Sequence, residues 1–247
     1  MTATASFRWE SASRSEVGNV RKLNEDACLD LSPSGLWVVA DGMGGHAAGD
    51  VASRMVTEKL RSVGKHERFS ELVNDVEDRV LEANERLYSM ATQGGEERII
   101  GCTFVGLLTN GTHCVSVWAG DSRVYRLRDG KLEQITRDHS EVEEMLQRGE
   151  ISANSAEAEA VQNIVTRAVG GTDRLFLDYT LDEIHDNDRF LICSDGLYKE
   201  LSAEDLTKQL GNTGCAAACD ALLTAALARE CSDNVTAIVV DFHEAKD

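Results

Sequence analysis

Four aspartates lie at the ends of apolar stretches that have the composition of buried strands. They are Asp41 after LWVVA, Asp121 after HCVSVWAG, Asp195 after RFLICS, and Asp233 just before the stretch that begins VTAIVVDF. A carboxylate is costly at the end of a core strand if it is buried alone, and it becomes favourable beside a divalent cation. Oxygen ligands of this kind suit magnesium, manganese or calcium. Because Asp-Gly is also a common turn signal, spacing alone leaves open whether the four side chains meet.

The segment VVADGMGGHAAGD, residues 38–50, joins one of these strand ends to four glycines and a histidine. A turn explains part of this pattern, and a phosphate-binding loop or a metal site explains more of it. The spacing Gly42-x-Gly44-x-x-Ala47 also resembles a dinucleotide-binding loop. No strand–helix–strand unit follows it and the chain lacks the lysine of a P-loop, so dinucleotide binding is the weaker alternative.

The composition is that of a globular protein with an acidic surface. The 247 residues are 42% hydrophobic and carry a formal net charge of −18, which argues against a general nucleic-acid binder because such a protein needs a basic footprint. No run approaches the roughly 18 apolar residues of a membrane helix, and the N-terminal MTATASFRWE lacks the apolar core of a signal peptide. We therefore expect a soluble, cytoplasmic protein without a membrane partner.

The seven cysteines do not form a recognisable framework. Their number is odd, they are scattered, and no C-x-x-C occurs. This pattern disfavours a set of disulfides or a zinc site and favours buried thiols in a reducing compartment.

Hydrophobic periodicity predicts an α+β chain in which short strands precede and follow a pair of long helices. The predicted strands cover 15–18, 27–31, 36–40, 102–109, 113–118, 123–127, 131–135, 174–181, 189–194 and 235–242. The predicted helices cover about 49–63, 70–90, 139–148, 157–168, 203–210 and 215–230. Hairpin signals such as Asp129-Gly130 favour antiparallel sheets.

Six stretches, in order along the chain, resemble the metal-dependent protein phosphatases of the 2C family in their bacterial form. They are GNVRKLNEDA (18–27), VVADGMGGHAAGDVAS (38–53), GCTFV (101–105), WAGDSRVYRLRDGKLEQITRDHS (118–140), LICSDGL (191–197) and SDNVTAIVV (232–240). The resemblance implies one catalytic domain over residues 1–247, with a flap subdomain at about 139–170. Its fold would be a four-layer α-β-β-α sandwich, in which two antiparallel β-sheets are flanked by helix pairs.

The same resemblance implies a metal centre built from Asp26, Asp41, Gly42, Asp121, Asp195 and Asp233. Asp41 would bridge two Mn²⁺ or Mg²⁺ ions, and the Gly42 carbonyl would ligate one of them. Asp195 and Asp233 would complete the first ion, and Asp26 would serve the second. Asp121, together with Asp195, matches the position of a third, weaker ion.

Other residues are assigned by the resemblance to the substrate and to support of the ligands. Arg21 matches the arginine that binds the substrate phosphate, and His46 matches the histidine proposed to protonate the leaving group. Glu25 and Asn234 lie next to ligands in the sequence and would support them. Asp138 and His139 are interpreted instead as a cap for the helix that begins at Ser140.

The implied reaction is hydrolysis of phosphoserine or phosphothreonine in proteins by in-line attack of a metal-bridging hydroxide. The expected partners are phosphorylated proteins and a Ser/Thr kinase that the enzyme opposes, and we expect a monomer. A non-catalytic phosphate-sensing module is the alternative, and an anti-sigma-factor antagonist is an alternative substrate. Within the flap the segment SANSAEAEAVQNIV is acidic and lacks the usual His-Pro pair, which leads us to hypothesise that it disfavours acidic phosphopeptides.

Overall fold

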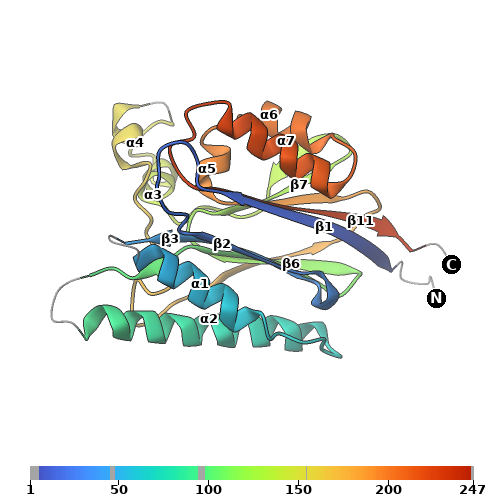
Figure 1. The fold of residues 1–247 in the computed structure, drawn as a ribbon, viewed down its shortest axis with the longest axis horizontal. Helices are drawn as coiled ribbons and strands as arrows, with labels where there is room; N and C mark the ends of the chain where they lie inside the picture. The colour runs from blue at the N-terminus through green and yellow to red at the C-terminus, as the bar shows by residue number, and fades with distance from the viewer. Residues whose placement is uncertain (1–5, 45–47, 94–97, 154, 246–247) are drawn as a thin grey trace.

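The computed structural model describes residues 6–44, 48–93, 98–153 and 155–245, which form two antiparallel sheets packed face to face between layers of helices (Figure 1). The first sheet has the order β1-β11-β10-β7-β8 and the second the order β2-β3-β5-β6-β9, with β4 paired to β3. The first sheet contains β1 (Phe7–Glu16), β7 (Arg123–Arg128), β8 (Lys131–Gln134), β10 (Arg189–Cys193) and β11 (Val235–Glu244). The second contains β2 (Asp26–Leu31), β3 (Leu36–Met43), β4 (Gly101–Cys102), β5 (Phe104–Thr109), β6 (His113–Ala119) and β9 (Asp178–Glu183).

Helices cover the outer face of each sheet, as Figure 1 shows. Against the second sheet lie α1 (Ala48–Leu60) and α2 (Phe69–Thr92), and against the first lie α5 (Asp195–Tyr198), α6 (Ala203–Leu210) and α7 (Cys215–Leu227). The short helices α3 (Glu141–Gln147) and α4 (Ala156–Val161) lie at one end of the sandwich, on the left of Figure 1. A 3₁₀ turn, η1 (Ser32–Ser34), joins β2 to β3.

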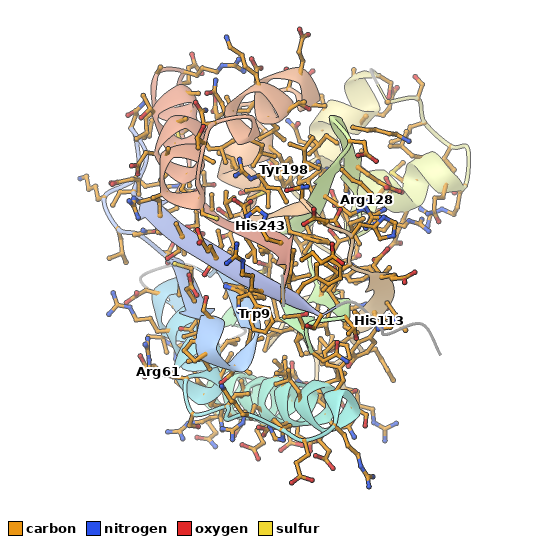
Figure 2. All side chains as sticks on the ribbon, turned by 90° about the vertical axis from the view of Figure 1, so that its right-hand side faces the viewer. Trp9, Arg61, His113, Arg128, Tyr198 and His243 are labelled. Atoms are coloured by element: carbon orange, nitrogen blue, oxygen red, sulfur yellow. The ribbon has the colours of Figure 1, made fainter. Side chains whose placement is uncertain are left out.

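Strand β3 shows why the second sheet is buried on both faces. Successive side chains of a strand point to opposite faces, and here Val38 and Ala40 enter the core under α1 and α2, while Trp37 and Val39 enter the core between the sheets. In the inter-sheet core the ring of Trp37 meets that of Trp9 edge to face at a centroid distance of 6.1 Å. Trp9, which β1 carries, is labelled in Figure 2. By the same alternation Asp41 follows Trp37 and Val39 and faces the space between the sheets.

The predicted α+β class, with two antiparallel sheets flanked by helices, is confirmed, and the boundaries of several elements differ from the prediction. The strand predicted at 174–181 begins at Asp178, because Leu175 and Leu177 pack against the helix-side core without pairing. The helix predicted at 157–168 ends at Val161, since Val165 forms a β-bridge with Ser140 that draws the chain away. The first strand is longer than predicted and starts at Phe7.

The thiols are buried and unpaired, as the sequence predicted. Six of the seven cysteines are buried and Cys28 is partly buried, and none is in a disulfide. Burial raises the pKa of Cys114, Cys215 and Cys219 to about 12 in each case. Across the described ranges, no helix combines the length and the apolar character needed to cross a membrane.

Candidate metal centre

Most of the predicted aspartates meet around one cavity at an end of the sandwich. A cavity of about 470 Å³ lies there, and its lining includes Arg21, Glu25, Asp41, Asp121, Asp195 and Asp233. Strands of both sheets end or begin at this edge, so residues from distant parts of the sequence come together. The sequence spacing left open whether these aspartates meet, and the fold brings them together.

Asp26 and Asp41 enter the site from neighbouring strands of the second sheet. They are directly opposite each other in the β2–β3 ladder, and cross-strand partners point to the same face. The Asp41 backbone is fixed by Thr103, whose Oγ1 accepts from the Asp41 N–H at 3.0 Å and whose own N–H donates to the Asp41 carbonyl at 2.8 Å. Asp41 keeps some exposure because it opens into the cavity, while Asp26 is buried.

Two hydroxyls, one from Ser194 just after β10 and one from Thr236 in β11, hold the Asp26 carboxylate. Ser194 and Thr236 both donate to Asp26 Oδ2, at 2.7 and 2.6 Å. The other oxygen, Oδ1, is buried without a hydrogen-bond partner. Burial raises the pKa of Asp26 to about 7, against the effect of the two hydroxyl donors, and the charges of Asp195 and Asp233 add to the increase.

Asp121 and Asp195 form the other side of the cluster. Asp121 follows β6 and is buried, and Asp195 is the first residue of α5. Burial, reinforced by the negative charge of Asp195, raises the pKa of Asp121 to about 7. Asp195 Oδ1 is buried without a partner, as Asp26 Oδ1 is. Two carboxylates of the cluster therefore each leave one oxygen unsatisfied.

These features fit a divalent cation. The pKa of Asp41 lies well above its usual range, first because the carboxyl is buried and then because four other carboxylates, those of Asp26, Asp195, Asp121 and Asp233, are close to it. Buried like charges that lack a countercharge favour protonation, and a bound cation reverses that preference. Unsatisfied carboxylate oxygens are the ligands that Mg²⁺ and Mn²⁺ take.

Among the described residues, no group of three or more acidic, histidine or cysteine side chains is arranged closely enough to hold a metal ion as it stands. Side-chain cations are paired with two of the carboxylates instead. Arg21 Nη2 contacts Asp233 Oδ2 at 2.7 Å, and Lys199 Nζ contacts Asp195 Oδ2 at 2.5 Å. The cluster is thus partly neutralised by the chain itself.

Gly42 occupies a position that admits no side chain. A Cβ there would lie 2.3 Å from the Gly49 carbonyl oxygen and 2.5 Å from that of Glu25, well inside van der Waals contact. The Gly42 N–H donates to the Glu25 carbonyl at 3.1 Å. The absence of a side chain at Gly42 is therefore required by close backbone packing between β3, the start of α1 and the loop before β2.

Asn234 holds the loop that carries Arg21. Its Oδ1 accepts from the Glu25 N–H at 2.8 Å, and its Nδ2 donates to the carbonyls of Val17 and Leu23 at 2.9 and 3.0 Å. One amide side chain thus fixes three backbone groups of residues 17–25. Of the remaining predicted site residues, Glu25 lines the cavity, and His46 lies outside the described residues.

Sequence reasoning missed Lys199 and the two hydroxyls on Asp26, since a lone Lys, Ser or Thr carries no distinctive spacing. The expected cap role of Asp138 and His139 was wrong. Ser140 itself is the N-cap and accepts from the Glu143 N–H, a signal present in the spacing Ser-x-x-Glu. Asp138 pairs with Arg123 at 2.7 Å, and His139 Nδ1 accepts from the Gly120 N–H at 3.1 Å, beside Asp121.

Comparison with known sequences shows the relatives of this chain. It is 34% identical over 230 residues to the serine/threonine protein phosphatase PstP of Mycobacterium tuberculosis, covering 93% of this chain and 44% of PstP. It therefore spans less than half of that relative's length. It is 32% identical over 240 residues to the serine/threonine phosphatase Stp of Listeria monocytogenes, covering 92% of this chain and 94% of Stp.

Solved structures of bacterial phosphatases resemble this chain over nearly its whole length. PppA, described as a key regulatory component of T6SS in Pseudomonas aeruginosa, superposes with a TM-score of 0.87 at 41% identity, covering 95% of this chain and 97% of PppA. The PstP catalytic domain in complex with two manganese ions gives 0.85 at 33% identity, covering 96% and 100%. The family described as "Protein phosphatase 2C" matches residues 19–229. This chain therefore belongs to the protein phosphatase 2C family.

Proposed function

We propose that this chain is a serine/threonine phosphoprotein phosphatase that works with two Mn²⁺ or Mg²⁺ ions. The observation that carries the proposal is the cluster of Asp26, Asp41, Asp121 and Asp195. Burial and then mutual repulsion raise the pKa of three of its members, and two buried oxygens have no partner. The names of the relatives supply the reaction class, and the manganese complex of the PstP catalytic domain supports the choice of metal.

We assign the ligands as the sequence predicted them. Asp41 would serve both ions, the Gly42 carbonyl and the carboxylates of Asp195 and Asp233 would hold the first ion, and Asp26 would hold the second. Asp121, with Asp195, offers a third and weaker position. When bound, such ions supply a nucleophile by lowering the pKa of coordinated water, and they neutralise the phosphoryl oxygens.

Arg21 binds the substrate phosphate in this proposal. Its guanidinium is half exposed at the cavity and is hydrogen-bonded to Asp233 through Nη2, so a phosphate at the cavity mouth can be reached by its remaining donors. The planar guanidinium offers two parallel hydrogen bonds to a phosphate, which an ammonium cannot do. The proton donor to the serine or threonine leaving group stays assigned to His46 as a prediction from resemblance.

The same proposal includes phosphorylated proteins as substrates and a Ser/Thr kinase that this enzyme opposes, acting as a monomer. A phosphate-sensing module without catalysis is disfavoured, because Arg21, Asp41, Asp195 and Asp233 are all present at the cavity.

Hydrolysis of p-nitrophenyl phosphate with Mn²⁺, with and without EDTA, tests the proposal. We expect activity that requires Mn²⁺, is abolished by EDTA, and is lost in Asp41→Asn and Asp195→Asn while both variants remain folded by circular dichroism. Activity that persists in EDTA would refute the metal mechanism. Full activity of Asp195→Asn at low Mn²⁺ would refute the ligand assignment.

A further inference from the structure

Lys199 joins the carboxylate cluster to the flap, residues 139–170. It directly follows α5, and its Nζ donates to Asp195 Oδ2 at 2.5 Å and to Asn163 Oδ1 at 2.7 Å. Asp195 is the first residue of α5, so this ion pair spans one helical turn. Asn163 belongs to the flap segment between α4 and the β-bridge at Val165, and it lines the same cavity. A single ammonium therefore contacts a proposed metal ligand and a flap residue at once.

Several carboxylates of the cluster together stabilise the positive charge of Lys199. The Lys199 side chain is 31% exposed and that of Asp195 is 15% exposed. Burial opposes the charged amine, yet the pKa of Lys199 is raised, because Asp195 and, at longer range, Asp121 and Asp41 stabilise the positive charge. The ammonium covers one oxygen of Asp195 and leaves the other, Oδ1, without a partner.

We propose that Lys199 is a positioning residue that acts as an exchangeable internal cation. Without divalent ions it holds Asp195 and Asn163 together and neutralises part of the cluster, and a divalent cation must compete with it for Asp195. Two positive charges at one carboxylate repel each other, and coupling between two binding events is reciprocal. The lysine therefore weakens metal binding, and metal binding loosens the link between Asp195 and the flap. This inference rests on the proposed function, because it requires Asp195 to be a metal ligand.

Calorimetric titration of Mn²⁺ into the EDTA-stripped, desalted full chain tests the competition without any measurement of activity. We compare the largest Mn²⁺ dissociation constant that the isotherm of each protein resolves. We expect this constant to be about fivefold smaller for Lys199→Met than for the wild type, as loss of a partly exposed ion pair would give. Lys208→Met is the matched control, since it removes the same charge from an exposed position on α6 and should leave the affinity unchanged. Lys199→Arg, which keeps a cation beside Asp195, should restore wild-type affinity.

Hydrogen–deuterium exchange of a peptide containing residues 162–165 tests the tether. In the metal-free protein we expect faster exchange in Lys199→Met than in the wild type. Asn163→Ala removes the flap contact but leaves the ammonium on Asp195. It should speed exchange in the same peptide with less effect on Mn²⁺ affinity than Lys199→Met. Addition of Mn²⁺ should speed exchange in the wild type and change it less in Lys199→Met.

The outcomes separate this inference from the proposed function. If the wild type gives no Mn²⁺ binding isotherm, the metal site itself is refuted and the inference falls with it. If the wild type binds Mn²⁺ and Lys199→Met binds it with the same affinity, the competition is refuted while the metal site stands. Equal exchange of residues 162–165 in the wild type and Lys199→Met would refute the tether.

Discussion

Asp26 and Asp41 face each other across the β2–β3 ladder, so the register of one strand pair brings two carboxylates to the same face at the edge of the inter-sheet core. Like charges directly opposite each other destabilise a sheet, and burial increases the penalty. Neither residue is paired with a cationic side chain within the described part of the chain. A bound cation would supply the countercharge that offsets the repulsion between these two carboxylates.

The metal-free protein should lose stability as pH rises from about 5 to about 8. Asp26 and Asp121 have folded-state pKa values of about 7, raised from the ordinary value of 3.8. In this window the folded chain holds more protons than the unfolded chain, so the free energy of unfolding falls with pH. Urea unfolding in EDTA at each pH measures the slope.

Asp41→Asn serves as the internal comparison for this pH dependence, because it removes one charge from the cluster. We expect it to be more stable than the wild type in EDTA at pH 8 by about 1–2 kcal/mol, with a shallower pH dependence. In saturating Mn²⁺ we expect the wild type to be more stable than Asp41→Asn. A variant that is less stable than the wild type in EDTA at pH 8 would contradict the proposed repulsion.

Replacement of Arg21 by lysine should reduce kcat/KM for a phosphothreonine peptide by about tenfold to a hundredfold. Lysine keeps the charge and loses the planar pair of donors that matches a phosphate. Arg14→Lys is the control, since Arg14 forms an exposed ion pair with Asp220 away from the cavity. Steady-state kinetics at saturating Mn²⁺ measure kcat/KM for both variants. An equal decrease of kcat/KM in Arg21→Lys and Arg14→Lys would contradict a specific role of Arg21 in phosphate binding.

Asn234→Ala should lower the free energy of unfolding by about 2–3 kcal/mol, because three backbone groups lose a partly buried hydrogen-bond partner. Asn212→Ala, which removes a single exposed hydrogen bond to Gln209, should change stability by less than about 0.5 kcal/mol. Urea unfolding in EDTA compares the two variants. Equal, small effects would mean that other contacts hold residues 17–25.

The acidic flap should select against acidic phosphopeptides. Glu157 and Glu159 are exposed in the first turn of α4, so changing both to glutamine should raise kcat/KM for an acidic phosphopeptide about two- to fivefold at low salt, with little change for a neutral one. The double variant Glu67→Gln/Glu85→Gln removes two exposed charges elsewhere and is the control. An unchanged peptide preference in the flap variant would count against this role.

The sequence predicted that Asp41, Asp121, Asp195 and Asp233 lie at the ends of buried strands, because an apolar run bounded by a carboxylate is a local pattern. It did not predict that Asp26 opposes Asp41, since register depends on pairing between strands. The contacts of Asp26 with Ser194 and Thr236 were equally inaccessible, because they join two sheets through residues 168 and 210 positions away. The order of the matched motifs carried the site assignment that local patterns could not supply.

Boundaries were predicted less well where tertiary contacts override local preference. The alanine-rich run after Ser155 favours a helix, yet α4 stops at Val161 and the chain turns to bridge Ser140. The β9 strand lies at the edge of its sheet, where its start depends on the β6 partner. For both α4 and β9, the hydrophobic pattern predicted that the element exists, and contacts with a neighbouring strand or loop determined where it begins or ends.

The burial of the thiols has a consequence for oxidative signalling. Peroxide and alkylating agents attack thiolates, and phosphatases that use a cysteine nucleophile are inactivated by them. In this chain six cysteines are buried, and Cys114, Cys215 and Cys219 are held protonated by pKa values of about 12. In the proposed function, dephosphorylation depends on carboxylate-held ions and an arginine, so it would continue during an oxidative burst that silences thiol-dependent enzymes.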